Sequence, residues 1–208
     1  GHVITPSSPA RPGRWRLSAS GGPVWASAGL DDFSKPSWRW GGQVSYRLGS
    51  VHALSLGAWY TKMYYEAGEG DYTPPKGFWT RRIAPTSTDA TCKILEVPLI
   101  WQRAPRGYGR SGWQYEAGLV SYWLLAEYYH YDYDLTDDDL IRWWGAHGEN
   151  HHLFAGGHLA IGHQWALGRH LGLGLQSFVQ FPLGGIGHGK VHLYTAGIQL
   201  QMSFGRWR

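Results

Sequence analysis

Apolar and polar residues alternate with a period of two along most of this chain. The clearest example is the segment 38–48, WRWGGQVSYRL, in which large apolar side chains occupy one set of alternate positions and polar side chains the other. Successive side chains point to opposite faces of a strand, whereas a helix would scatter the same residues around its circumference. The segment is therefore predicted to be a β-strand with one apolar and one polar face.

The same alternation recurs in seven further segments, so the sequence predicts eight strands. Their alternating stretches begin at Trp15, Trp38, Leu54, Leu95, Trp113, His152, Leu171 and Tyr194. The connections differ in length: short ones lie near 49–53, 103–112 and 167–170, and longer ones at 29–37, 67–90, 129–150 and 184–190. Short periplasmic turns and long extracellular loops are typical of outer-membrane barrels. An even number of strands brings both termini to the periplasmic side.

Aromatic residues gather near both ends of the predicted strands. If the first strand runs outward, the group near the periplasmic end is Trp15, Trp101, Trp113, Tyr115, Trp165 and Phe204. The group near the opposite end is Trp25, Trp38, Trp40, Tyr60, Trp123, Phe181 and Tyr194. Two aromatic girdles around an aliphatic band match the two interfaces of a bilayer. A strand of about eleven residues tilted by about 40° covers roughly 28 Å, close to the hydrocarbon thickness.

Composition helps to decide which face points outward, since a period of two does not. Of the 208 residues only 16% are charged, whereas 43% are hydrophobic and 30 are glycine. A soluble, lipocalin-like ligand-binding barrel, the alternative, would need many Lys, Glu and Asp on its polar face, which here carries mainly Ser, Gly, Gln, Thr and His. We therefore predict an all-β protein, an eight-stranded antiparallel up-and-down transmembrane β-barrel over residues 14–208. Residues 1–13 are read as a periplasmic Pro/Ser-rich linker.

Other classes receive little support from the sequence. No run of residues approaches the eighteen or so apolar positions of a membrane-spanning helix. The single cysteine, Cys92, excludes an intramolecular disulfide. The net charge of +4 is modest and its cations are scattered, so no nucleic-acid partner is expected.

Three stretches resemble the small outer-membrane β-barrel domains common in Bacteroidota, including the PorT-like group. They are LSLGAWYTKMYYEAG (54–68), CKILEVPLIWQ (92–102), with Glu96 and Pro98 in the matching places, and YTAGIQLQMSFGRW (194–207). The resemblance covers residues 15–207. It implies an eight-stranded outer-membrane barrel and little about activity. The His-rich segment 147–163 and the DYDLTDDD loop depart from the family pattern.

Four charged residues fall on the polar face: Arg39, Arg47, Glu96 and Glu116. The interior of an eight-stranded barrel is just wide enough for side chains to fill, and charges buried there must be paired. We therefore expect an Arg–Glu ion-pair network that plugs the lumen. A gated ion path or a catalytic carboxylate pair is the weaker interpretation.

The loop 128–140, together with the Trp143–Trp144 pair that follows it, offers the best candidate contact with a partner. Its candidate residues are Asp132, Asp134, Asp137, Trp143 and Trp144. The aspartates could take Ca²⁺, but the glycine and terminal glutamate of an EF-hand are missing. The histidines match no zinc motif either. We expect no metal and no cofactor, and an acidic, solvated extracellular loop.

The predicted function is a non-enzymatic integral outer-membrane barrel with a filled polar lumen and no open pore. It would act as a membrane anchor or accessory subunit of an envelope or secretion assembly. Its expected partners are outer-membrane lipid and other envelope proteins, met through the extracellular loops or the N-terminal periplasmic segment. The alternative is an outer-membrane lipid-modifying barrel enzyme, for which no nucleophile–His–carboxylate set is visible.

Overall fold

The computed structural model describes residues 13–30 and 33–205. All of the predicted linker except Gly13 lies outside these residues. The strands are β1 (Trp15–Ser27), β2 (Ser37–Arg47), β3 (His52–Gly68), β4 (Ser87–Arg103), β5 (Gly112–Asp132), β6 (Trp143–Ala146), β7 (Asn150–Ala166), β8 (Leu171–Pro182) and β9 (Tyr194–Phe204). A 3-10 turn, η1 (Thr80–Arg82), interrupts the β3–β4 loop. No helix in the described part of the chain is long and apolar enough to cross a membrane.

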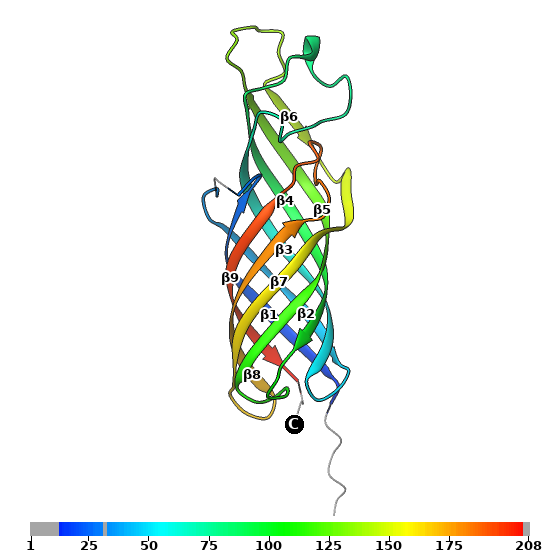
Figure 1. Ribbon diagram of the computed structural model, residues 1–208, viewed down its shortest axis with the longest axis vertical. Helices are drawn as coiled ribbons and strands as arrows, with labels where there is room; N and C mark the ends of the chain where they lie inside the picture. Colours follow the sequence, from blue (N-terminus) through cyan, green and yellow to red (C-terminus); the bar gives the residue numbers. More distant parts are fainter. Residues whose placement is uncertain (1–12, 31–32, 206–208) are drawn as a thin grey trace, which may run out of the picture.

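Eight of these strands close into an antiparallel barrel (Figure 1). Each strand of the barrel pairs with the next along the chain, β5 pairs with β7, and β1 pairs with β9 to complete the ring. The remaining strand, β6, pairs only with the end of β5, from Glu127 to His130. Among the described residues, the predicted eight-stranded up-and-down barrel is confirmed.

The apolar side chains of the barrel point outward. Leu56 is 57% exposed and Leu99 is 39% exposed, whereas Gln43, Gln176 and other polar residues of the opposite face are buried in the lumen. A water-soluble barrel would bury the leucines and expose the glutamines, because burial of apolar surface stabilises its fold. The arrangement is that of a transmembrane barrel, and the soluble alternative is wrong.

The two ends of the barrel differ, as the loop lengths predicted. One end carries the short turns after β2, β4 and β7, the start of β1 and the end of β9 (Figure 1). The opposite end carries the long loops 69–86, 133–142 and 183–193. We call these the short-turn end and the long-loop end.

Three neighbouring strands reach beyond the rest at the long-loop end. β2 pairs with β3 only as far as Thr61, and β7 pairs with β5 only as far as Leu124, whereas β3 continues to Gly68 and β5 to Asp132. β4 stays paired with both over this length. With β6 they form a sheet that stands above the barrel wall (Figure 1). Most of this region falls in segments predicted to be loops, although the alternation of buried and exposed residues continues to Gly68 and Asp132.

Candidate functional site

The polarity of β3 and β4 reverses at the start of this raised sheet. On the outward face of β3, Leu56 and Tyr60 are followed by Lys62, which lies opposite Lys93 of β4. Lipid would not accept such outward charges, because a lysine is costly on the lipid face of a barrel. Residues 62–68, 87–93, 126–132 and 143–146 therefore stand outside the bilayer. We call them the strand extension.

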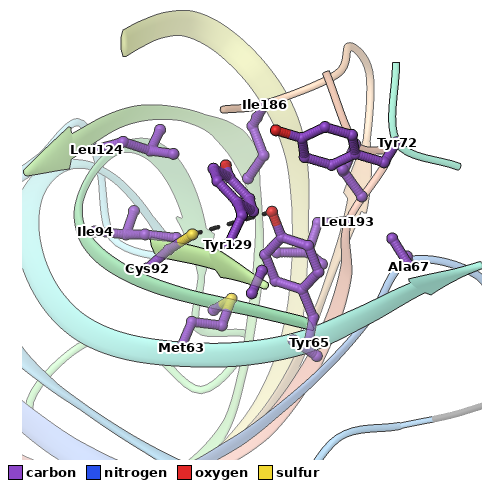
Figure 2. Close-up of a cluster of buried hydrophobic side chains, with 14 of the residues drawn as sticks. Met63, Tyr65, Ala67, Tyr72, Cys92, Ile94, Leu124, Tyr129, Ile186 and Leu193 are labelled. Carbon is purple, nitrogen blue, oxygen red and sulfur yellow. Dashed lines mark hydrogen bonds between the residues drawn. The ribbon is translucent and has the colours of Figure 1, made fainter. Parts of the chain in front are cut away.

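The interior of the extension is apolar where the barrel lumen is polar. Its buried residues belong to a cluster of seventeen, the apolar plug, which continues into the adjoining barrel and the loops. Figure 2 labels Met63, Tyr65, Cys92, Ile94 and Tyr129 among them. Outside the membrane the hydrophobic effect favours apolar side chains inside and charged ones outside, as in a soluble sheet. The same strands therefore follow opposite rules on either side of Tyr60.

The loop 183–193 is fastened over the plug by a buried carboxylate. Glu127 is 1% exposed and accepts hydrogen bonds from the Tyr129 hydroxyl at 2.5 Å, the Asn150 amide at 2.5 Å and the His188 backbone N–H at 2.8 Å. The Gly187 N–H donates to Nε2 of His152 at 2.9 Å. Burial lowers the pKa of His188, and the Glu127 carboxylate partly opposes that effect.

A second loop, 69–86, lies against the same plug. The Tyr72 hydroxyl is 2.7 Å from that of Tyr131, and Figure 2 shows the Tyr72 ring lying beside Tyr129 and Ile186. The Thr73 N–H donates to the Gly189 carbonyl at 2.7 Å, which joins the two loops. The plug and the loops thus close the long-loop end.

The three predicted loop aspartates have different surroundings. Asp137 forms a salt bridge with Arg81 at 3.0 Å, which holds loop 133–142 against the β3–β4 loop. Asp134 is exposed in the same loop. Asp132 ends β5, 3.6 Å from Nδ1 of His130.

The two tryptophans lie on β6 and face opposite sides. The Trp143 ring packs at a tilt of 40° against the His130 ring, with centroids 4.1 Å apart, and Trp143 is 72% exposed. Trp144 packs against Phe78 and His188, with centroids 5.2 Å away in each case. Trp143 therefore offers an accessible aromatic surface, whereas Trp144 joins β6 to the loops over the plug.

In the lumen, the structure brings together two of the four predicted charges. Arg39 and Glu96 are 2% and 1% exposed, and the Arg39 guanidinium lies 2.9 Å from the Glu96 carboxylate. Gln180 donates to the same carboxylate at 2.9 Å, and Arg39 donates to Gln199 at 2.9 Å. The guanidinium also lies over Trp59, 4.5 Å from its ring.

The other two predicted charges are elsewhere in the lumen. Glu116 accepts a hydrogen bond from Gln102 at 2.6 Å and lies 3.5 Å from Nε2 of His158. Arg47 is half-buried at the short-turn end, where its backbone N–H donates to the Arg14 carbonyl. Glu116 is thus contacted by an amide and an imidazole, whereas Arg39 lies beside Glu96.

Glu127 and the plug tyrosines were missed by the sequence analysis. The inward alternation of the strands continues beyond the aromatic girdle at the long-loop end with Tyr65, Tyr129 and Tyr131. The outward positions there include Lys62 and Lys93. The sequence signal that marks the end of the lipid-facing segment is a lysine at an outward position, while the inward positions of the same strand become aromatic.

Comparison with known proteins supports the fold and goes no further. No protein-family model matches the sequence, and no curated protein matches it. Among solved structures, Neisserial surface protein A is similar with a TM-score of 0.51 and 11% identity over 93% of this chain and 97% of that one. The attachment invasion locus protein Ail of Yersinia pestis has a TM-score of 0.49 and 6% identity over 91% of this chain and 96% of that one. The N-terminal barrel domain of Pseudomonas aeruginosa OprF has a TM-score of 0.44 and 10% identity over 93% of this chain and 100% of that one.

The likeness to Neisserial surface protein A agrees with the strand count, closure and outward apolar face described above. None of these three proteins points to the PorT-like group, so that resemblance stays a prediction. The chain has the eight-stranded transmembrane fold of bacterial outer-membrane barrels.

Proposed function

We propose that this protein is a non-enzymatic outer-membrane anchor or accessory subunit of an envelope or secretion assembly. The observation that carries the proposal is the strand extension, which raises a rigid sheet beyond the lipid-facing band. Such a sheet costs conformational entropy to order, and a barrel that only filled the membrane would not need it. The long-loop end lies outside the cell and the short-turn end in the periplasm.

The packing of the lumen supports a role without an open pore. Two sets of contacting polar side chains fill the lumen. One set is Arg39, Glu96 and Gln180, and the other is Gln102, Glu116 and His158. Above them lies the apolar plug. An eight-stranded barrel has little room beyond such side chains.

The exposed surface of the extension suits contact with a protein partner. Trp143 is 72% exposed, and Leu135 in the adjacent loop is 56% exposed. Aromatic residues held on a rigid element are frequent anchors of interfaces, because they bury a large area at low entropic cost. The segment 1–13, of which only Gly13 belongs to the described residues, is the second proposed contact, on the periplasmic side.

Photo-crosslinking in native membranes tests the anchor role. A photoreactive amino acid at Trp143 should give a discrete protein adduct, whereas one at Leu56, in the lipid-facing band, should give lipid adducts alone. Lipid adducts alone from both positions, and from Asp134, would contradict a partner at the long-loop end.

Two further measurements test the rest of the proposal. The purified barrel in a planar bilayer should show no steady large conductance, and a persistent one would contradict the filled lumen. Turnover of outer-membrane lipid by the folded barrel would favour the lipid-modifying enzyme.

A further inference from the structure

The outward face of the extension gathers three carboxylates and one imidazole on adjacent strands. Asp89 of β4 lies opposite Glu66 of β3 on one side and opposite His130 of β5 on the other. Asp132 follows two residues after His130, on the same face. One ligand atom from each of Asp89, His130 and Asp132 can be chosen so that all three lie within 4.8 Å of one another.

None of the three carboxylates forms a salt bridge with a lysine or an arginine in the described part of the chain. Carboxylates directly opposite each other on neighbouring strands, such as Glu66 and Asp89, repel and destabilise the pair. The Lys35 ammonium, on the same side of β3, instead lies over the Tyr64 ring, 4.3 Å from its centroid.

The backbone holds the three groups in a fixed arrangement. β4 and β5 are paired from Ser87–Asp132 to Arg103–Tyr115, and β6 flanks them. The Trp143 ring, which packs at a tilt against His130 with centroids 4.1 Å apart, limits the rotation of the imidazole. A site built on paired strands keeps its geometry better than one on a loop.

We propose that Asp89, His130 and Asp132 bind one first-row divalent metal ion at the long-loop end. One imidazole nitrogen and two carboxylate oxygens suit Zn²⁺ and its neighbours, whereas Ca²⁺ takes six to eight oxygens. Two ligands about 2.0–2.1 Å from Zn²⁺ lie about 3.4 Å apart in a tetrahedral site. The 3.6 Å between Nδ1 of His130 and the Asp132 carboxylate is close to that separation. The remaining coordination positions are open to water.

Calorimetric titration of the untagged, detergent-folded barrel with Zn²⁺ tests the site. The expected result is one Zn²⁺ bound per chain, with affinity reduced at least tenfold in Asp89→Asn and in His130→Asn. The matched controls are Asp138→Asn, an exposed loop carboxylate, and His170→Asn, an exposed imidazole at the short-turn end, and both should bind as the wild type does. Ca²⁺ should not compete at equal concentration.

A spectroscopic readout separates loss of the site from loss of the fold. Co²⁺ bound to the wild-type barrel should give visible absorption that is absent in His130→Asn, while heat-modifiable gel migration shows that the variant is folded. The proposal is overturned if the wild type shows no saturable Zn²⁺ binding, or if Asp89→Asn and His130→Asn bind Zn²⁺ as tightly as the controls.

Discussion

Single side chains in the lumen have little freedom to change, because each is bonded to several others. Glu96 accepts hydrogen bonds from Arg39, Thr61 and Gln180, and it is 1% exposed. Removing one partner of a buried ion pair costs more than the pair itself contributes, since the remaining charge has no water to solvate it.

The substitution Glu96→Gln therefore leaves the Arg39 guanidinium buried without a counter-charge. We expect the free energy of unfolding to fall by about 3–5 kcal/mol. Urea unfolding in lipid vesicles, followed by tryptophan fluorescence, measures this change. Asp138→Asn, at an exposed loop position, should alter it by less than about 0.5 kcal/mol. An equal midpoint for wild type and Glu96→Gln would refute the buried pair.

Alternation predicts which face a residue occupies, but not which partner it meets. Arg39, Glu96 and Glu116 all point into the lumen, as their positions on the polar face require. That Glu96 rather than Glu116 lies beside Arg39 depends on the stagger of strands around the barrel. Stagger is set by the closure of β1 on β9, which no local pattern records.

At the scale of elements, closure of the ring depends on a close approach between β1 and β9. A Cβ at Gly22 would lie 2.0 Å from the Ile198 carbonyl oxygen and 2.8 Å from the Gln199 Cα. Backbone atoms of a paired strand move little, so only glycine fits there without displacing β9.

Gly22→Ala should therefore loosen the seam between the first and last strands. We expect a loss of about 1–3 kcal/mol in unfolding free energy, the usual cost of overpacking. Gly29→Ala is the control, because a Cβ there meets no atom within 4 Å. Both are compared by the urea midpoint of the folded band on unheated gels, and equal midpoints would show that β9 accommodates the added Cβ without loss of stability.

The loop 183–193 is an element whose docking should depend on pH. Because burial lowers the pKa of His188, the folded state prefers the neutral imidazole. Docking is then complete above the ordinary histidine pKa of about 6.5 and weakens as pH falls through the lower folded value. Hydrogen exchange of residues 183–193, corrected for intrinsic rates, should be faster at pH 5 than at pH 7.5. His188→Gln should reduce that difference, and a pH-independent loop would contradict the interpretation.

Irregular elements were the least predictable part of the fold. β7 bulges opposite Ser121, where Phe154 has a φ of 49° and its N–H donates to the Ser121 hydroxyl. The bulge places Ala155 against the plug, whereas strict alternation assigned it to the outward face. β6 was hidden for a similar reason: its four residues are too few to show a period and depend on β5 for pairing.

At the scale of the whole molecule, the apolar face of the strands changes from the outside to the inside where the surroundings change from lipid to water. Alternation continues through β3, β4 and β5, but the side that is apolar switches near Tyr60. Sequence reasoning with one rule for the entire strand predicts the barrel and misses the extension. It misses the Asp89–His130–Asp132 cluster too, because the three residues come from two strands and are adjacent only after pairing.

Two positions on the same face of β3 test where the lipid ends. Leu56 lies in the apolar band, and Lys62, six residues on, lies in the extension, roughly 20 Å away along the strand. In intact cells, Lys62→Cys should react with a membrane-impermeant maleimide at least tenfold faster than Leu56→Cys.

Ser50→Cys, in an exposed short turn, should react only after the outer membrane is opened. The native Cys92, fully buried in the plug, keeps the wild-type background unreactive while the barrel is folded. Rapid labelling of Leu56→Cys would place the band in water, and labelling of Ser50→Cys in intact cells would reverse the orientation of the barrel.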